Sequence, residues 1–505
     1  MLFRMNLMDR RRFLIASAAT AASLKSFAQT ASALRLQTAK LTLHPDRPGP
    51  TIPQNFIGLS YETQQLSEPS FFSPANSGLI AQFHALAAHG VLRIGGNTSD
   101  VGWWKPATAS PRPALPANVD LIVPPGERSP LDLAYAITPE AVRNLRGFLD
   151  ATGWTCLYGI NLGTNTPALA AEQAAFAAKT LGAKLEYFQL GNEPDHFPNR
   201  FRDRAKWSSD SYLDEWLAAA NAIRARVPEA RFGLPDVANN ATWIAAIAER
   251  MAVLADAPAV AAISHHYYFN GPPSNPKVNI DDLLRPDPRV QHDAELARAA
   301  ALKLHTRYRM TEGNTCFRGG KPGVSDVFAA SLWAADYLLT LASLGYAGVN
   351  LHGGEGKMVA DSLGGTLPGE LLMKDRTVPH PRPFYTPIAD IDGKYIAEPV
   401  SYGMRFAQQF AGTTIIPIDF DPGPVNATSF AAKRSDGKYI LAIINKDAAQ
   451  ELTLQLPSAA ESWETTFADS LDSTVVHQGH ATVAASREAK VGPHSMLLLT
   501  GFKLA

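Results

Sequence analysis

The sequence predicts an α/β protein in which a (β/α)8 (TIM) barrel is joined to an antiparallel β-sandwich built from both termini. Eight short apolar runs alternate with segments of helical period over most of the chain. From about residue 413 the pattern changes to short alternating runs separated by turn signals. A chain of 505 residues is also too long for one small core, so more than one domain is expected.

The apolar runs have the length of buried strands, and they lie at residues 56–62, 91–96, 155–163, 185–193, 231–237, 260–268, 308–312 and 347–353. Segments rich in Ala and Leu at helical spacing lie at residues 80–89, 141–151, 168–181, 211–226, 241–254, 294–308 and 326–344. Alternation of strand and helix favours a parallel sheet, and eight such units fit a closed barrel. A doubly wound open sheet is the alternative, but no Gly-x-Gly-x-x-Gly motif follows an early strand.

The sandwich is predicted from seven runs, at residues 414–420, 428–431, 439–445, 452–456, 464–467, 482–485 and 495–499. A segment before the barrel alternates in the same way and is expected to supply strands to it. The chain therefore divides into an export signal (1–28), N-terminal sandwich strands (34–48), a barrel (49–412, closed by a helix at 400–409) and the C-terminal sandwich (413–505).

The N-terminus has the pattern of a twin-arginine export signal. Arg10-Arg11-Arg12 precede a short apolar stretch at 15–22, and small residues follow it. A general secretory signal is the alternative; a membrane anchor fits less well, because Lys25 interrupts the end of the apolar stretch. We expect a protein that is exported to the periplasm or secreted.

Composition argues against several kinds of partner. The chain has 46 basic and 47 acidic residues, and residues 1–28 hold five of the basic and one of the acidic ones, so the remainder carries a net charge of −5. A mildly acidic protein is a poor candidate for binding nucleic acid or a long sulfated polyanion. Cys156 and Cys316 are expected to be small buried side chains, with a bridge between them left open, and no Cys/His spacing indicates zinc. We expect a monomer that needs no cofactor and binds no membrane.

Functional side chains are expected where the barrel strands end, because the C-terminal rim of such a barrel carries the active site. Four strands end in polar clusters, which are Arg93 to Asn97, Asn192-Glu193, His265-His266-Tyr267-Tyr268, and Glu312. Two long loops rich in Pro and Gly, 106–125 and 353–399, are expected to shape a cleft at this rim.

Hydrolysis of a glycosidic bond requires two carboxyl groups, and two glutamates on one rim can supply them. We assign Glu193 as acid/base and Glu312 as nucleophile, since strands four and seven face each other across a barrel. Carboxyls about 5–5.5 Å apart would retain the anomeric configuration. Asn192 is expected to bind the sugar 2-hydroxyl, and Tyr267 to donate a hydrogen bond that keeps Glu312 ionised.

Each of these residues also has a structural interpretation. A Glu before Pro is usually a surface turn residue, and a Glu that ends a strand before Gly is often structural. His265 and His266 are neighbours on a strand and point to opposite faces, so at least one is expected to be structural and no metal site is predicted.

Asn192-Glu193-Pro194, with a second glutamate on the seventh strand, resembles the retaining glycosidases of the large (β/α)8 clan. Within that clan, His-His-Tyr-Tyr-Phe-Asn-Gly at 265–271 and Leu-Arg-Ile-Gly-Gly at 92–96 are similar to glycoside hydrolase family 79, the heparanase and β-glucuronidase family. The resemblance covers nearly the whole mature chain and is greatest to bacterial exo-β-glucuronidases. It implies hydrolysis of terminal β-linked glucuronic acid with retention of configuration.

The resemblance also implies binding roles. Backbone amides of Gly319 and Gly320, together with Tyr402, would hold the sugar carboxylate, and a plain turn is the alternative for the two glycines. Glu62 and Asn97 would hold ring hydroxyls.

The chain departs from heparanases, which line a long cleft with Lys and Arg and are matured by excision of a linker. An acidic chain without an obvious linker favours a pocket and exo action, with 106–125 closing one end. An endo action on glycosaminoglycans stays open because of a basic run, Arg200, Arg202, Arg204 and Lys206. The structural alternative for this run is a solvated loop. A β-xylosidase or β-glucosidase of the clan is a further alternative, as is a carbohydrate-binding protein on an inactive barrel, which the presence of both glutamates opposes.

Overall fold

A computed structural model describes residues 36–123, 128–238, 240–373, 382–456, 458–482 and 487–503. Its centre is a closed barrel of eight parallel strands in the order β10-β11-β2-β3-β6-β7-β8-β9. The predicted barrel is confirmed, and the open-sheet alternative is wrong. The predicted export signal, residues 1–28, lies outside the described residues. No helix in the described part of the chain is long and apolar enough to span a bilayer.

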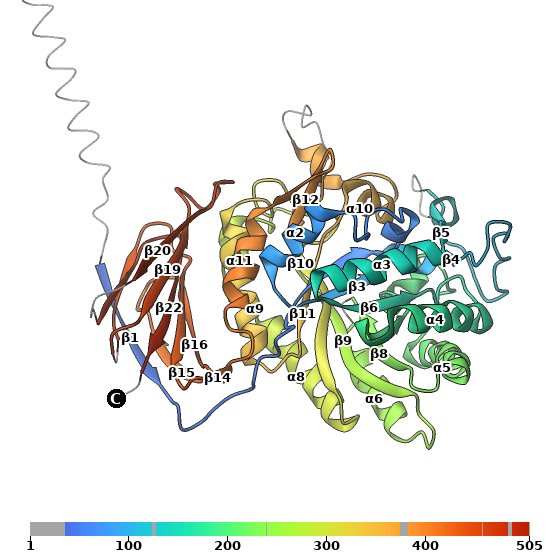
Figure 1. Ribbon diagram of the computed structural model, residues 1–505, viewed down its shortest axis with the longest axis horizontal. Helices are drawn as coiled ribbons and strands as arrows, with labels where there is room; N and C mark the ends of the chain where they lie inside the picture. The colour runs from blue at the N-terminus through green and yellow to red at the C-terminus, as the bar shows by residue number, and fades with distance from the viewer. Residues whose placement is uncertain are drawn as a thin grey trace, which may run out of the picture.

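All eight predicted runs coincide with barrel strands, which are β2 (Ile57–Glu62), β3 (Val91–Gly95), β6 (Thr155–Ile160), β7 (Leu185–Leu190), β8 (Arg231–Val237), β9 (Ala259–Asn270), β10 (Arg307–Cys316) and β11 (Val349–His352). The predicted helices correspond to α2 (Ser77–Leu86), α3 (Pro139–Thr152), α4 (Pro167–Leu181), α5 (Ser209–Arg226), α6 (Thr242–Ala252), α8 (Pro288–Lys303), α9 (Phe328–Ser343) and α11 (Pro399–Gln408). Figure 1 shows the helices around the outside of the barrel.

Local sequence explains where two of these helices begin. The Thr138 side chain accepts a hydrogen bond from the Ala141 amide at the start of α3, and Thr166 does the same for α4. A proline occupies the first helical position in both, where its missing N–H costs nothing. These Thr-Pro pairs set the length of the loops that precede the helices.

The barrel interior changes from apolar to polar along the strands. Val91, Leu157 and Tyr187 belong to a small buried apolar cluster. Two residues further along the same strands lie Arg93 and Gln189, whose side chains are also buried and hydrogen-bonded to each other. Because side chains alternate along a strand, these pairs share the inner face. The C-terminal end of the barrel is therefore a buried polar site.

Two sheets form the sandwich, ordered β15-β1-β18-β21 and β14-β16-β17-β22-β19-β20. Their strands are β1 (Leu36–Leu43), β14 (Thr414–Ile416), β15 (Ile418–Asp421), β16 (Ala427–Lys433), β17 (Tyr439–Asn445), β18 (Glu451–Gln455), β19 (Ser462–Phe467), β20 (His477–Thr482), β21 (Glu488–Val491) and β22 (Ser495–Phe502). The N-terminal β1 lies in the first sheet, as predicted. It pairs antiparallel with β15 but parallel with β18, so the sandwich is not wholly antiparallel. The predicted run at 482–485 falls almost entirely outside the described residues.

Strand β17 of the six-stranded sheet is buried on both faces. Leu441 and Ile443 of β17 pack in the sandwich core, whereas Ile440, Ala442 and Ile444 belong to the large barrel cluster. The sheet reaches that cluster beside α9, which lies between the barrel strands and the sandwich (Figure 1). This contact makes the sandwich a continuation of the barrel core.

Candidate active site

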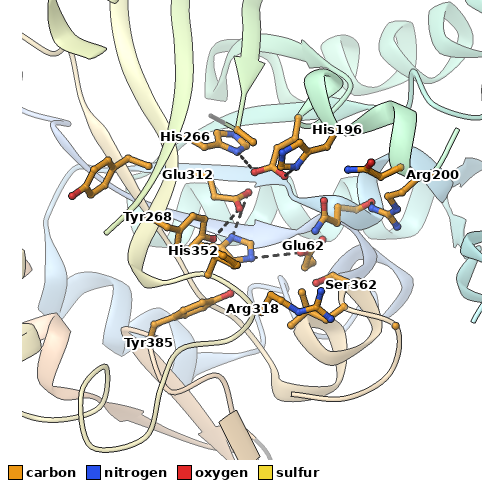
Figure 2. A pocket seen from close by; sticks show the side chains of 18 of the residues that line it. Glu62, His196, Arg200, His266, Tyr268, Glu312, Arg318, His352, Ser362 and Tyr385 are labelled. Carbon is orange, nitrogen blue, oxygen red and sulfur yellow. Dashed lines mark hydrogen bonds and ion pairs between the residues drawn. The ribbon is translucent and has the colours of Figure 1, made fainter. Parts of the chain in front are cut away.

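The C-terminal ends of the barrel strands open into a cavity of about 540 Å³ (Figure 2). Side chains from the strand ends line it, namely Glu62, Asn97, Glu193, His266, Tyr268, Glu312 and His352. Both long loops contribute as predicted, because Ile122 comes from the first and Ser362, Leu363 and Tyr385 come from the second. The cavity is of the size that binds small ligands.

Glu312 lies on β10 where the strand register shifts on both sides of the strand. A bulge of this kind redirects side chains, and such bulges are common beside active sites. Each carboxylate oxygen has one close donor: Arg93 Nη1 is 2.7 Å from Oε2, and the Tyr268 hydroxyl is 2.9 Å from Oε1. His352 Nδ1 lies 3.7 Å from Oε2. These contacts fix the orientation of the carboxylate.

Arg93 ties together four strands below the cavity. Its side chain is 1% exposed, and its Nη2 donates to Asn192 Oδ1 and to Asp236 Oδ2, each at 2.7 Å. Burial would lower the pKa of Arg93, but the charges of Asp236 and Glu312 outweigh burial and raise it. The guanidinium is therefore permanently charged, and it pairs with the carboxylates of Asp236 and Glu312.

Glu193 follows β7 and has a left-handed backbone, with φ 48°. Its Oε1 lies 2.9 Å from His266 Nδ1, and its Oε2 lies 3.3 Å from His196 Nδ1. Burial alone would raise the pKa of Glu193, but the hydrogen bonds from His196 and His266 outweigh it and lower the pKa. Glu193 is consequently ionised at neutral pH in the free site.

His266 connects the two sides of the site. Its Nε2 is 3.0 Å from Asp236 Oδ1, so both ring nitrogens face carboxylates and both carry protons. Burial lowers the pKa of His266, but Asp236, Glu312 and Glu193 raise it to about 10. Ligand atoms of Glu193, His266 and Glu312 all lie within 4.8 Å of one another. A doubly protonated imidazole has no lone pair for a metal, so this group does not suit an ion.

Glu62 and His352 form a second pair at the cavity wall. The carboxylate accepts hydrogen bonds from the Thr98 amide and hydroxyl, and its Oε1 is 3.5 Å from His352 Nε2. Burial would raise the pKa of Glu62, but the bonds from His352 and Thr98 lower it. Asn97 lies nearby and accepts from Asn192 Nδ2 at 3.3 Å. Glu62 and Asn97 thus stand where ring hydroxyls can reach them, while both Asn192 side-chain atoms already have partners.

The prediction that Tyr267 donates to Glu312 is wrong. Tyr267 borders the cavity, but its hydroxyl donates to Asp287 at 2.8 Å and its ring stacks on Tyr337. The donor to Glu312 is Tyr268, because alternation along β9 points His266 and Tyr268 to the inner face. His265 points outward and bonds the Tyr346 hydroxyl, which confirms that one of the paired histidines is structural.

The predicted carboxylate-binding residues are placed differently from expectation. Gly320 donates its amide to the Cys316 carbonyl, so this amide already has an acceptor. Neither Gly319 nor Gly320 lines the cavity, and the role of the Gly319 amide stays a prediction. Tyr402 lies on α11, away from the cavity, with the Arg405 guanidinium over its ring. The cavity tyrosine from this part of the chain is Tyr385.

The basic run after β7 does not form one patch. Arg200 lines the cavity, whereas Arg202 is buried and pairs with Glu215. Arg204 bonds Asn199 on the surface, and the Lys206 side chain is 83% exposed. The two cysteines, Cys156 and Cys316, are buried free thiols that do not form the bridge left open above.

Sequence reasoning missed several residues of the site, among them Asp236, His196, His352, Tyr385 and the buried Arg93 as a link between carboxylates. Asp236 and His352 end β8 and β11, so the rule that selected Glu193 and Glu312 could have found them. Tyr385 lies in a long loop, and no sequence signal marks it.

Comparison with known proteins finds β-glucuronidases. No protein-family model matches the sequence. A protein named β-glucuronidase from Aspergillus niger is 27% identical over 310 residues, which is 57% of this chain and 55% of that protein. Another so named, from Neurospora crassa, is 24% identical over 291 residues, or 52% of this chain and 50% of that protein. The chain thus spans about half the length of the relatives it matches.

Solved structures share the fold over nearly the whole chain. A 4-O-α-L-rhamnosyl-β-D-glucuronidase from Fusarium oxysporum has a TM-score of 0.66 at 17% identity, covering 92% of this chain and 100% of its own. An α-L-arabinofuranosidase from Thermotoga maritima has a TM-score of 0.65 at 13% identity, with coverage of 92% and 100%. These relatives agree with a glycoside hydrolase barrel; membership of family 79 and closeness to bacterial enzymes stay predictions.

Proposed function

We propose that the protein is a retaining exo-β-glucuronidase that releases terminal β-linked glucuronic acid from oligosaccharides or glycoconjugates. One observation carries the proposal: oxygens of Glu193 and Glu312, from opposite sides of the barrel rim, lie within 4.8 Å of each other in the cavity. Retaining glycosidases hold their two carboxyls about 5–5.5 Å apart, and inverting enzymes hold them further apart. The fungal relatives named β-glucuronidase support the choice of sugar.

In the first step Glu312 attacks the anomeric carbon while Glu193 protonates the leaving oxygen, and the glycosyl ester forms on Glu312. Arg93 and Tyr268 hold the two oxygens of Glu312, which leaves the carboxylate oriented before substrate arrives. In the second step Glu193 takes a proton from water, which attacks the ester and releases glucuronic acid.

The low pKa of Glu193 in the free site has to be reconciled with its acid role. The longer and more exposed of its two contacts is His196, whose side chain is 40% exposed. A leaving group beside Glu193 would take the place of this contact and exclude water. Without the hydrogen bond from His196, less remains to lower the pKa of Glu193, while burial still raises it. The carboxyl can then gain the proton that it delivers to the leaving oxygen.

The loops around the cavity support exo action. Residues of both long loops wall it, and of the basic run only Arg200 reaches it among the residues described. Export to the periplasm or medium rests on the pattern of residues 1–28 alone.

Release of 4-nitrophenol from its β-glucuronide, with the β-glucoside alongside, tests the substrate. We expect strong preference for the glucuronide. Activity only on heparan-type polymers would replace the proposal with an endo enzyme, and equal activity on both glycosides would remove the glucuronic acid assignment while leaving the two-glutamate mechanism.

Azide separates the two glutamates. We expect Glu312→Ala and Glu193→Ala to lower turnover on the order of 100- to 10,000-fold or more. With an activated glucuronide, azide should restore Glu312→Ala with an α-glucuronosyl azide, because one displacement inverts C1. It should restore Glu193→Ala with a β-azide, because two displacements occur. The same anomer from both variants would refute the assigned roles.

A further inference from the structure

Most cations around the cavity already have acceptors. Arg289 pairs with Asp287, and Arg200 donates to the Asn97 carbonyl at 3.2 Å. Arg318 lines the same cavity, is partly buried, and makes no ion pair or hydrogen bond with any residue that the structure describes. A cation held in a cavity without an acceptor leaves its charge available for an anionic ligand.

The chain fixes Arg318 in place on both sides. The Phe317 amide donates to the Asn270 carbonyl at 3.1 Å, which continues the pairing of β10 with β9. The Gly319 carbonyl accepts from the Phe384 amide at 2.7 Å. The base of the Arg318 side chain is therefore anchored, as a preorganised binding group requires.

The backbone of Arg318 is strained. Its φ is 65°, a left-handed conformation that is unfavourable for a residue with a Cβ. The next two residues, Gly319 and Gly320, also have positive φ and adopt it freely. A non-glycine residue retained in such a conformation beside a reaction centre points to a function for its side chain.

Arg318 lies on the side of the cavity away from the two histidines that contact Glu193. Figure 2 shows it on the same side of the cavity as Tyr385 and across from His196 and His266. Those histidines contact Glu193, which protonates the leaving oxygen. The leaving group therefore lies on the histidine side, and the ring that carries the anomeric carbon extends toward Arg318.

We propose that Arg318 binds the C5 carboxylate of the glucuronosyl unit and sets the preference for glucuronides over neutral glycosides. This assignment rests on the proposed function. The planar guanidinium matches a carboxylate with two parallel hydrogen bonds, and such a pair is strong where water is scarce. A β-glucoside has a hydroxymethyl group at the same position and gains no charge pairing.

The test compares Arg318→Gln with Arg128→Gln, using 4-nitrophenyl β-glucuronide and β-glucoside. Arg128 lines the same cavity, and its one acceptor in the described chain, the Asp132 carbonyl, is 3.5 Å away. For Arg318→Gln we expect kcat/KM on the glucuronide to fall about 100-fold, with no loss on the glucoside. The inhibition constant of free glucuronic acid should rise similarly. Arg318→Lys should retain part of the preference, and Arg128→Gln should retain most of it.

An undiminished preference for the glucuronide in Arg318→Gln would overturn the assignment, and so would equal losses on both glycosides. The same selective loss in Arg128→Gln would also overturn it, because it would indicate that the overall positive potential of the cavity sets the preference. Thermal unfolding of each variant shows that the fold is intact. Failure of the proposed function looks different, because the unaltered protein would then show no preference for the glucuronide.

Discussion

At the scale of single residues, three of the carboxylates in the site are balanced by two buried cations. Asp236, Glu193 and Glu312 surround Arg93 and His266, and each cation touches two of the carboxylates. Buried charges persist only when paired, and removing one member leaves the others uncompensated. The protonation of Glu193 therefore depends on its neighbours more than on its own burial.

Replacing His196 should move the pH profile of the reaction. His196→Ala removes one of the two hydrogen bonds that lower the pKa of Glu193, so that pKa rises. The limb of kcat/KM that falls with increasing pH reports the acid of the free enzyme, and we expect it to move to higher pH. The measurement is kcat/KM on a β-glucuronide from pH 4 to 9.

His84→Ala is the matched control, because His84 is an exposed histidine on α2 that does not line the cavity. Its profile should match that of the unaltered protein. A limb that stays in place or moves to lower pH in His196→Ala would contradict the role given to His196.

Tyr267 and Tyr268 show how residue-scale prediction can fail. The string His265-His266-Tyr267-Tyr268 marks a strand end, and the alternation rule separates its two faces. Which face is inner depends on the register of β9 against β10, where Glu312 pairs with His266 across a shift. That register is a property of two strands together, so the sequence of β9 alone does not show that Tyr268 rather than Tyr267 reaches Glu312.

At the scale of elements, loops form part of the cavity wall, and tight turns fix the positions of its side chains. Gly96 follows β3 with φ 76°, and a Cβ on it would lie 2.4 Å from Glu62 Oε2. The turn between β3 and the following helical segment therefore has room for glycine alone. The backbone approaches Glu62 closely enough to set its position.

Gly96→Ala should damage both stability and activity. The left-handed backbone costs alanine about 1–2 kcal/mol, and the clash with Glu62 adds about 1–3 kcal/mol as overpacking. Gly437→Ala separates the backbone cost from the cost of the clash, since Gly437 has φ 82° but nothing within 4 Å of an added Cβ. We expect urea unfolding to show the larger loss for Gly96→Ala, with lower kcat/KM in that variant alone. Equal losses in both variants would show that the clash is relieved without cost.

At the scale of the whole molecule, α9 joins the barrel to the sandwich. Asp336 on this helix accepts from Thr428 at 2.7 Å and from Lys446 at 2.6 Å, and both partners belong to the sandwich part of the chain. The Lys446 side chain is 2% exposed. A buried ammonium group with one carboxylate partner makes the two parts depend on each other.

Asp336→Ala should therefore destabilise the whole molecule. We expect a loss of about 3 kcal/mol in the free energy of unfolding, because Lys446 stays buried without its partner. Glu461→Ala is the control, since it removes an ion pair with Lys438 that lies on the sandwich surface. Differential scanning calorimetry should show a clearly lower transition for Asp336→Ala and little change for Glu461→Ala. Equal transitions would mean that the buried pair adds nothing to the contact.

The order and type of the elements can be predicted from local sequence, since period and turn residues are local properties. The eight barrel strands, the sandwich and the two glutamates at strand ends could all be predicted from runs of a few residues. Which groups meet in the cavity depends instead on how the elements pack together. Arg93 reaches Glu312 across 219 residues of chain, and Tyr385 and Arg318 enter from loops. Such contacts depend on strand register and loop path, which arise from packing of the whole barrel and leave no local mark.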